Sequence, residues 1–320
     1  MKNVEPIESK SDETRKEPNL WRRIIGLKGY KGWAIKALLI LLSFMLLTSG
    51  ILEIYLLSIR PKDLVLSPVG DSQYINTLLI GLDAGLLPDG STMPSRSDVL
   101  MLISFNRQTK EALLLSIPRD TMVYYDDLGS NRINAAHVFG NSELVVNKVE
   151  ELLETDVHYL AKVNFKGFQA LVDAIGGISL YVEKDMEYYD PYDVPPLIID
   201  LKEGYQKLDG NKAEQYVRYR DEMGDIGRVE RQQKFVNAFF KRLINPVSWL
   251  KLPFLALTMK DYLQTNLHIN NGISLTWRYI FSKEVYKSTL PGYGEYFNGA
   301  SYWIPTGLSL QEIFEQIKLD

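Results

Sequence analysis

Apolar and polar positions divide the chain into a membrane-like segment near its beginning and a globular part behind it. The region 33–59 is apolar, and its stretch 37–52 contains no charged residue. As an α-helix this region measures ~40 Å, which is enough to cross a bilayer with some tilt. We therefore expect a basic tail at 1–32, a transmembrane helix at 33–59, a linker at 60–71 and one soluble domain at 72–320.

The charge that flanks the apolar segment predicts its orientation. Residues 1–32 carry eight Lys and Arg against five Asp and Glu, although the whole chain has a net charge of −4. Positive charge stays on the cytoplasmic side, so we expect a single-pass protein with a cytoplasmic N-terminus and an extracytoplasmic domain. An uncleaved anchor is favoured over a signal peptide, because the preceding region is long and no small-x-small site follows. The absence of cysteine agrees with export without requiring it.

Strand and helix patterns alternate through the globular part. Apolar, β-prone runs cover 75–82, 98–105, 111–117, 158–163, 178–182 and 285–290. Helical periodicity covers 141–154, 165–175, 211–217, the stretch from about 226 to 243, 246–262, 272–282 and 309–318. Residues 183–207 predict an acidic and aromatic loop region. The pattern indicates an α/β domain with a mixed sheet covered on both faces, a core at 74–245 and a helical C-terminal part at 246–320.

Charged residues stand at matching ends of the first three predicted strands. Asp83 ends the first, Arg96 and Asp98 begin the second, and Arg119 follows the third. In an up-down-up meander all four meet at one sheet edge, where ligand sites tend to lie. Two neighbouring aspartates suit a hard cation such as Mg²⁺, and arginines suit phosphate. Taken singly, an Asp at a strand end is more often a turn former.

A second group of arginines lies between Arg218 and Gln232. Extended backbone would place Arg218 and Arg220 on one face, and Arg228, Arg231 and Gln232 follow at helical spacing behind Asp225, a predicted N-cap. Such a fork suits a ligand with several adjacent anionic oxygens. The alternative is a solvated, salt-bridged surface helix. The acidic net charge gives no reason to expect nucleic acid as the partner.

Together these segments resemble the LytR–CpsA–Psr (LCP) family of bacterial cell-envelope proteins. The resemblance runs from about Tyr74 to Asn245. The segments that carry it are 76–83 (NTLLIGLD), 96–98 (RSD), 116–120 (SIPRD), 132–136 (RINAA), 171–177 (LVDAIGG), 208–210 (LDG) and 218–232. The family is built as a short cytoplasmic tail, one membrane helix and an extracytoplasmic three-layer α/β/α domain.

The resemblance implies a phosphotransferase that moves a glycopolymer, such as teichoic acid or a capsular polysaccharide, from undecaprenyl-pyrophosphate to peptidoglycan through a phosphodiester. Catalytic roles would fall to Asp83, Asp98, Arg96, Arg119, Arg218 and Arg220, with Asp83 and Asp98 as ligands of magnesium or manganese. Pyrophosphate would be bound by Arg96, Arg119, Arg218, Arg220, Arg228 and Gln232. Support would come from Arg132, Asp225 and Arg231. Apolar strand and helix faces would line a tunnel for the polyprenyl chain.

The sequence departs from the family pattern at a few positions, and two other functions stay open. Val99 stands where Thr is usual, Asn266 follows Thr265 in place of Asp, and His137 replaces a frequent Tyr. None of these changes removes a proposed ligand. The alternatives are a non-catalytic envelope regulator that binds polyprenyl-pyrophosphate and a hydrolase that cleaves the lipid pyrophosphate with water. The sequence contains no phosphate-loop, zinc-protease or serine-hydrolase motif.

Overall fold

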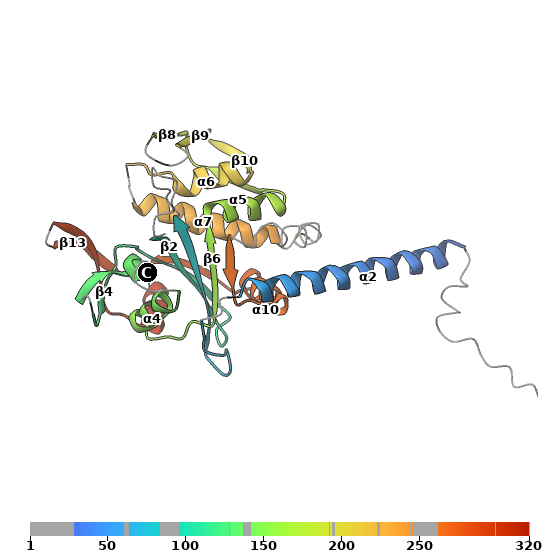
Figure 1. The fold of residues 1–320 in the computed structure, drawn as a ribbon, viewed down its shortest axis with the longest axis horizontal. Helices are drawn as coiled ribbons and strands as arrows, with labels where there is room; N and C mark the ends of the chain where they lie inside the picture. Colours follow the sequence, from blue (N-terminus) through green and yellow to red (C-terminus); the bar gives the residue numbers. More distant parts are fainter. Residues whose placement is uncertain are drawn as a thin grey trace, which may run out of the picture. The chain divides into compact units, whose positions relative to one another are not determined.

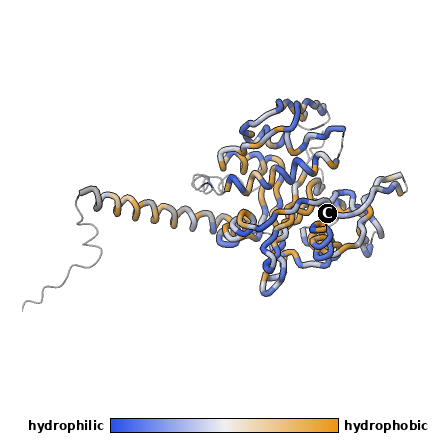
Figure 2. The backbone as a smooth tube through the Cα atoms, turned by 180° about the vertical axis from the view of Figure 1, so that it is seen from behind, coloured by the Kyte–Doolittle hydropathy of each residue, from blue (hydrophilic) through white to orange (hydrophobic). Residues whose placement is uncertain are grey.

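The structure, a computed structural model, describes residues 29–60, 64–83, 96–127, 129–136, 142–191, 193, 196–222, 225–243, 245, 262–297 and 299–319. The chain divides into two compact units, Met1–Thr48 and Ser49–Asp320. Most of helix α2 (Gly29–Ser58) belongs to the first unit. Its part Trp33–Ser58 has a mean hydropathy of 2.2 and is long enough to cross a membrane. This helix matches the expected segment and supports a single-pass anchor; Figure 2 shows its hydrophobic character.

A mixed sheet of six strands forms the centre of the second unit, in the order β11-β6-β1-β2-β3-β12. Its strands are β1 (Tyr74–Asp83), β2 (Arg96–Asn106), β3 (Ala112–Ile117), β6 (Tyr159–Asn164), β11 (Leu263–Thr265) and β12 (Val285–Thr289). The first three form the predicted antiparallel meander, while β6 runs parallel to β1 and β12 runs parallel to β3. Strands from both ends of the unit therefore complete one sheet (Figure 1).

Helices cover both faces of this sheet, which confirms the three-layer α/β/α fold. One face packs against α4 (Ser142–Leu153), α11 (Leu310–Ile317) and the 3-10 turn η1 (Ile133–Ala135). The other face packs against α7 (Asp225–Leu243) and α10 (Ile269–Ile280). Along β2, Leu100 and Leu102 belong to the first core, whereas Met101 and Ile103 belong to the second. Because both faces are buried, the central strands are apolar at nearly every position.

A third apolar core lies beyond α7 and includes α5 (Phe165–Ala174) and α6 (Gly210–Arg218). It also uses two small sheets, β7 (Ile178–Val182) with β10 (Gly204–Leu208) and β8 (Met186–Asp190) with β9 (Leu197–Leu201). The loop predicted for 183–207 is therefore wrong. The strands escaped the sequence argument because their outward positions carry Tyr, Glu and Asp, and β8 exposes three successive residues. Only pairing with distant partners orders these short segments.

The C-terminal part also differs from the expectation. Besides α10 and α11, the described residues 262–319 contain β11, β12 and the hairpin β13 (Gly292–Phe297) with β14 (Ala300–Pro305). The sequence pattern predicted a largely helical C-terminal part with one strand, 285–290, and no such hairpin. A further hairpin, β4 (Met122–Tyr125) with β5 (Gly129–Arg132), follows the meander. Residues 246–261, which make up nearly all of the helix expected at 246–262, lie outside the described residues, and so does His137.

Candidate functional site

The backbone brings the predicted residues of the meander to one edge of the sheet. Asp83 and Arg96 are direct cross-strand partners. Leu100 pairs with Ile117, so Arg119 lies at the same edge. A bulge separates the Gly81–Val99 pair from the Leu82–Ser97 pair, which leaves Asp98 as the extra residue of β2. Bulges redirect side chains and are common beside active sites.

The proposed metal ligands fit this edge by backbone position. Asp83 and Asp98 stand on adjacent strands within the bulged register, and Mg²⁺ commonly uses one or two carboxylates together with phosphate oxygens. A Cβ atom on Gly81 would lie 2.9 Å from Cβ of Val99, so the close approach of β1 to β2 at the bulge requires glycine. The side chains of Asp83, Arg96 and Asp98 lie outside the described part of the structure. Their metal and phosphate roles therefore stay predictions.

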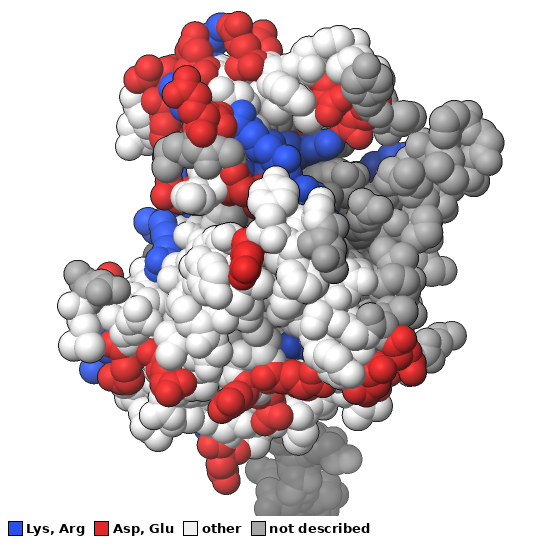
Figure 3. Space-filling model, turned by 90° about the vertical axis from the view of Figure 1, so that its left-hand side faces the viewer, with Lys and Arg blue, Asp and Glu red and all other residues white. Residues whose placement is uncertain are grey.

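A cavity of about 740 Å³ extends between the sheet and helices α5, α7 and α10. Its long wall is apolar and includes Ile75, Leu79, Met101, Ile103, Phe105, Phe168, Phe235, Phe239, Phe240, Leu275 and Tyr279. Its polar lining includes Arg119, Arg218, Arg220, Arg228 and Gln232. In Figure 3, Lys and Arg gather in a hollow below an acid-rich upper part; the surface directly below the hollow carries few charges, and acidic residues follow the lower rim of the globular unit. One cavity thus combines an apolar wall with a cationic group of four arginine side chains.

Arg218 is held on the cavity wall by two carboxylates and an aromatic ring. Its guanidinium lies 2.7 Å from Asp193 Oδ2 and donates to Glu214 Oε1 at 2.9 Å. Its Cζ atom lies 4.6 Å from the ring centre of Phe165. Burial, the largest influence, lowers the pKa of Arg218, but Glu214 and Asp193 together outweigh it and raise that pKa. The prediction of extended backbone is wrong at Arg218, because Arg218 is the last residue of α6. The backbone becomes extended only at Tyr219.

Helix α7 contributes the second part of the cationic group. Arg228 and Gln232 are one turn apart and both line the cavity. Asp225, the first residue of α7, lies 2.6 Å from Arg228 Nη2 and 3.6 Å from Arg220 Nη2. Gln232 donates to the backbone oxygen of Val217 at 3.3 Å, which ties α7 to α6. Asp225 and Gln232 therefore connect the two segments that carry the arginines.

Arg231 does not line the cavity and instead holds the connection between α6 and α7. It is buried, donates to the backbone oxygen of Tyr219 at 2.8 Å and lies 3.2 Å from Asp221. Asp221 also contacts Lys184 at 2.8 Å, and this hydrogen bond raises the pKa of Lys184. A Cβ atom on Gly227 would lie 2.7 Å from Asp221 Oδ1, so glycine leaves room for the carboxylate. Arg231 thus fastens the backbone between Arg218 and Arg220.

Arg132 also lies away from the cavity wall. Its Nε atom lies 3.3 Å from Asp120, the neighbour of Arg119, and donates to the backbone oxygen of Ser301 at 3.0 Å. Its Cζ atom lies 5.5 Å from the ring centre of Tyr302. Arg132 therefore joins the loop of Arg119 to β14.

Sequence reasoning missed several residues that surround the arginines. Phe165, Asp193 and Glu214 contact Arg218, and Asp221 and Lys184 complete the group around Arg231. Glu214 had a usable signal, because it precedes Arg218 by four residues on a helix. Phe165 begins helix α5, and Lys184, Asp193 and Asp221 lie in separate loops, so no spacing in the sequence joins them to the arginines.

The chain is similar to known proteins over most of its globular part. It is 30% identical over 245 residues to the polyisoprenyl-teichoic acid–peptidoglycan teichoic acid transferase TagT of Bacillus subtilis (strain 168), covering 77% of this chain and 76% of that protein. A solved structure of TagT bound to LIIa-WTA matches with a TM-score of 0.63 and 28% identity, covering 81% and 94% of the two chains. The LytR-CPS2A-psr family protein YwtF (TagT) with bound octaprenyl pyrophosphate lipid matches with a TM-score of 0.59 and 27% identity, covering 81% and 93%. The model of the LytR_cpsA_psr family matches residues 58–319, and the chain belongs to that family.

Proposed function

We propose that this protein is a membrane-anchored phosphotransferase that moves a glycopolymer from undecaprenyl-pyrophosphate to peptidoglycan through a phosphodiester. One observation carries the proposal: an apolar cavity of about 740 Å³ whose lining also includes four arginines. A polyprenyl pyrophosphate has the matching chemistry, with a long apolar chain and an anionic head. The names of the related TagT proteins, and the octaprenyl pyrophosphate in one related structure, support this assignment.

Binding would use both parts of the cavity. The apolar wall removes the polyprenyl chain from water, which is the main source of affinity for such a ligand. Arg119, Arg218, Arg220 and Arg228 would bind the pyrophosphate oxygens through charge-assisted hydrogen bonds. Asp193, Glu214 and Asp225 hold three of these guanidinium groups before the ligand arrives. Such preorganisation lowers the cost of ordering on binding.

The proposed reaction is a phosphoryl transfer. The acceptor hydroxyl oxygen forms a bond to the sugar-proximal phosphorus, the bond from that phosphorus to the bridging oxygen breaks, and undecaprenyl phosphate leaves. Asp83 or Asp98 takes the hydroxyl proton. A bound Mg²⁺ held by Asp83 and Asp98 would neutralise charge on the phosphoryl group. The arginines stabilise the charge that develops on the leaving phosphate.

Transfer is tested with the full chain in detergent, a labelled lipid-pyrophosphate-saccharide, peptidoglycan fragments and Mg²⁺. We expect label to move onto the glycan, and we expect this movement to be lost in the Arg218→Ala/Arg220→Ala variant and with a chelator. Arg107→Ala is the control, because Arg107 lies in the turn at the opposite end of β2 and β3.

Two outcomes of this assay would replace the proposal. Release of saccharide phosphate without attachment would identify a hydrolase. Tight lipid binding without turnover would identify a regulatory lipid-binding protein. Activity that persists in chelator, or in an Asp98→Asn variant, would remove the metal from the mechanism.

A further inference from the structure

The hairpins β4–β5 and β13–β14 form one aromatic surface beside the arginine group. Four large aromatic side chains of these hairpins are exposed: Tyr124 (62%), Tyr293 (57%), Phe297 (56%) and, on the opposite face of β13, Tyr296 (81%). Monomeric domains seldom expose several large aromatic side chains together without a binding role.

The register of the strands places these side chains on connected faces. Tyr293, Glu295 and Phe297 occupy alternate positions of β13 and therefore share one face. Tyr302, which pairs with Glu295, lies on the same face. On the other hairpin, Met122 pairs with Arg132, so Tyr124 lies on the face of Arg132. Arg132 Cζ lies 5.5 Å from the ring centre of Tyr302. This stacking joins the two hairpin faces into one surface.

The surface is tied to the loop that carries Arg119. Trp303 donates its backbone N–H to the oxygen of Asp120 at 2.9 Å, and Arg132 pairs with the Asp120 carboxylate at 3.3 Å. Asp120 directly follows Arg119, which lines the cavity. In Figure 1 the hairpins lie on the left, the side that faces the viewer in Figure 3, where the surface directly below the cationic hollow carries few charges and acidic residues follow the lower rim.

Charge decides which ligand suits this surface. Residues 119–132 carry two arginines and three aspartates, and 292–305 carry one glutamate and no Lys or Arg. Arg132 is already paired with Asp120. A polyanionic donor chain, a nucleic acid or an anionic lipid surface would meet no surplus of positive charge. Exposed aromatic rings with few charges suit the apolar faces of uncharged sugar rings.

We infer that the β4–β5 and β13–β14 hairpins bind the acceptor glycan, with its amino-sugar rings against Tyr124, Tyr293 and Phe297. This inference rests on the proposed transferase function and adds an acceptor site to it. Tyr293 and Phe297 are about 13 Å apart along the strand, so they contact different sugar rings. The glycan then approaches the Arg119 side of the cavity, where the phosphorus is bound.

The test measures binding of an uncharged N-acetylglucosamine tetrasaccharide to the full chain in detergent by calorimetry. We expect Tyr293→Ala/Phe297→Ala to weaken this binding roughly tenfold to a hundredfold, with unchanged binding of octaprenyl pyrophosphate. Tyr205→Ala is the matched control, because Tyr205 is 86% exposed on the separate strand β10. Phe297→Tyr keeps the ring and should retain binding.

Each result decides the inference. Unchanged tetrasaccharide binding in the double variant would overturn it, as would a wild-type chain that transfers saccharide but binds no tetrasaccharide. Loss of binding to phosphatidylglycerol vesicles in the double variant, without an effect on the sugar, would show that the surface meets the membrane instead. Tyr124→Ala, on the other hairpin, repeats the test if the double variant does not fold. Failure of the proposed function looks different, because the wild type would then attach no labelled saccharide to the glycan in the transfer assay, whether or not it binds the tetrasaccharide.

Discussion

Replacement of Asp221 by alanine should weaken the fold and the arginine site together, although Asp221 is not on the cavity wall. The side chains of Asp221 and Arg231 are only 5% and 7% exposed. Removing the carboxylate leaves the buried guanidinium of Arg231 without its ionic partner, and breaking a buried pair in this way typically costs about 3–5 kcal/mol. Arg231 keeps its hydrogen bond to Tyr219 and its contact with that ring, so we expect about 3 kcal/mol.

Thermal unfolding of the full chain in detergent, followed by circular dichroism, measures this loss. At roughly 2–4 °C per kcal/mol for a domain of this size, Tm should fall by about 6–12 °C. Looser backbone at Tyr219 also displaces Arg218 and Arg220, so octaprenyl pyrophosphate affinity should fall roughly tenfold, as expected when charge-assisted contacts lose their geometry.

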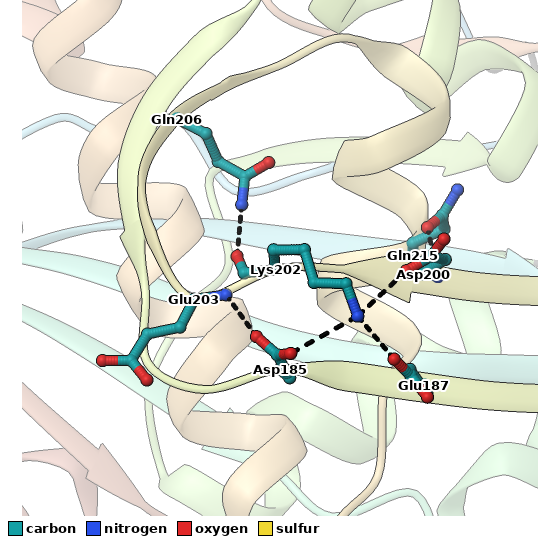
Figure 4. A network of polar contacts seen from close by, with 7 residues as sticks. All are labelled: Asp185, Glu187, Asp200, Lys202, Glu203, Gln206 and Gln215. Carbon is teal, nitrogen blue, oxygen red and sulfur yellow. Dashed lines mark hydrogen bonds and ion pairs between the residues drawn. The ribbon is translucent and has the colours of Figure 1, made fainter.

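The exposed charge network around Lys202 provides the control. Lys202 lies 3.3 Å from Asp185 and 3.8 Å from Asp200, and all three side chains are more than half exposed (Figure 4). Because solvent screens such pairs, Asp200→Ala should leave Tm and lipid affinity unchanged. An Asp221→Ala variant that loses less than about 1 kcal/mol would refute the argument that this buried pair stabilises the arginine segment.

Three further predictions concern the cavity, the core and a helix cap. Met101→Trp places a larger side chain on the apolar wall of the cavity and should lower the affinity for octaprenyl pyrophosphate about tenfold, while inorganic pyrophosphate still binds. Titration calorimetry measures both affinities. Equal loss of both ligands would contradict the role of this wall in binding the polyprenyl chain. Burial lowers the pKa of His158, whose Nδ1 accepts from the backbone N–H of Asn76. Below the unfolded pKa of 6.5 only the unfolded state takes up the proton readily, so stability should fall as pH decreases through the folded pKa. His158→Gln should flatten this slope in urea unfolding curves, and an unchanged slope would exclude His158 as its source. Asn164→Ala removes the cap that accepts from Gly167 N–H and should cost about 1 kcal/mol in the same assay, whereas no loss would mean that the cap is dispensable.

The agreement between sequence and structure is greatest where the chain's own pattern is strong. Strands β1, β2 and β3 are apolar throughout, because both faces of the sheet are buried, and their short connections leave little choice of neighbour. The α/β class, the anchor-like helix and the convergence of Asp83, Arg96 and Arg119 at one edge followed from that pattern.

Disagreement is concentrated in short, polar elements. Strands β8 and β13 carry exposed Tyr and acidic residues, and β9 exposes Ile198 and Asp200, so the alternation of apolar and polar positions is masked in the sequence. The same holds for the end of α6, where Arg218 completes a helix that the extended pattern did not predict. Local propensity is weak in such segments, and long-range pairing determines their conformation.

The sequence by itself determined the membrane-like helix, the three-layer α/β domain and the two arginine-bearing segments, because each depends on periodicity or on neighbours along the chain. Only the tertiary structure decided that Arg119 and the Arg218–Gln232 segment share one apolar cavity, since this joins strands and helices about 100 residues apart. It also decided which of these side chains reach the cavity. Arg228 and Gln232 line the cavity, whereas Arg231 contacts Asp221 and Arg132 contacts Asp120. The direction of a side chain depends on the partners that folding brings to it, and spacing along the chain does not contain that information.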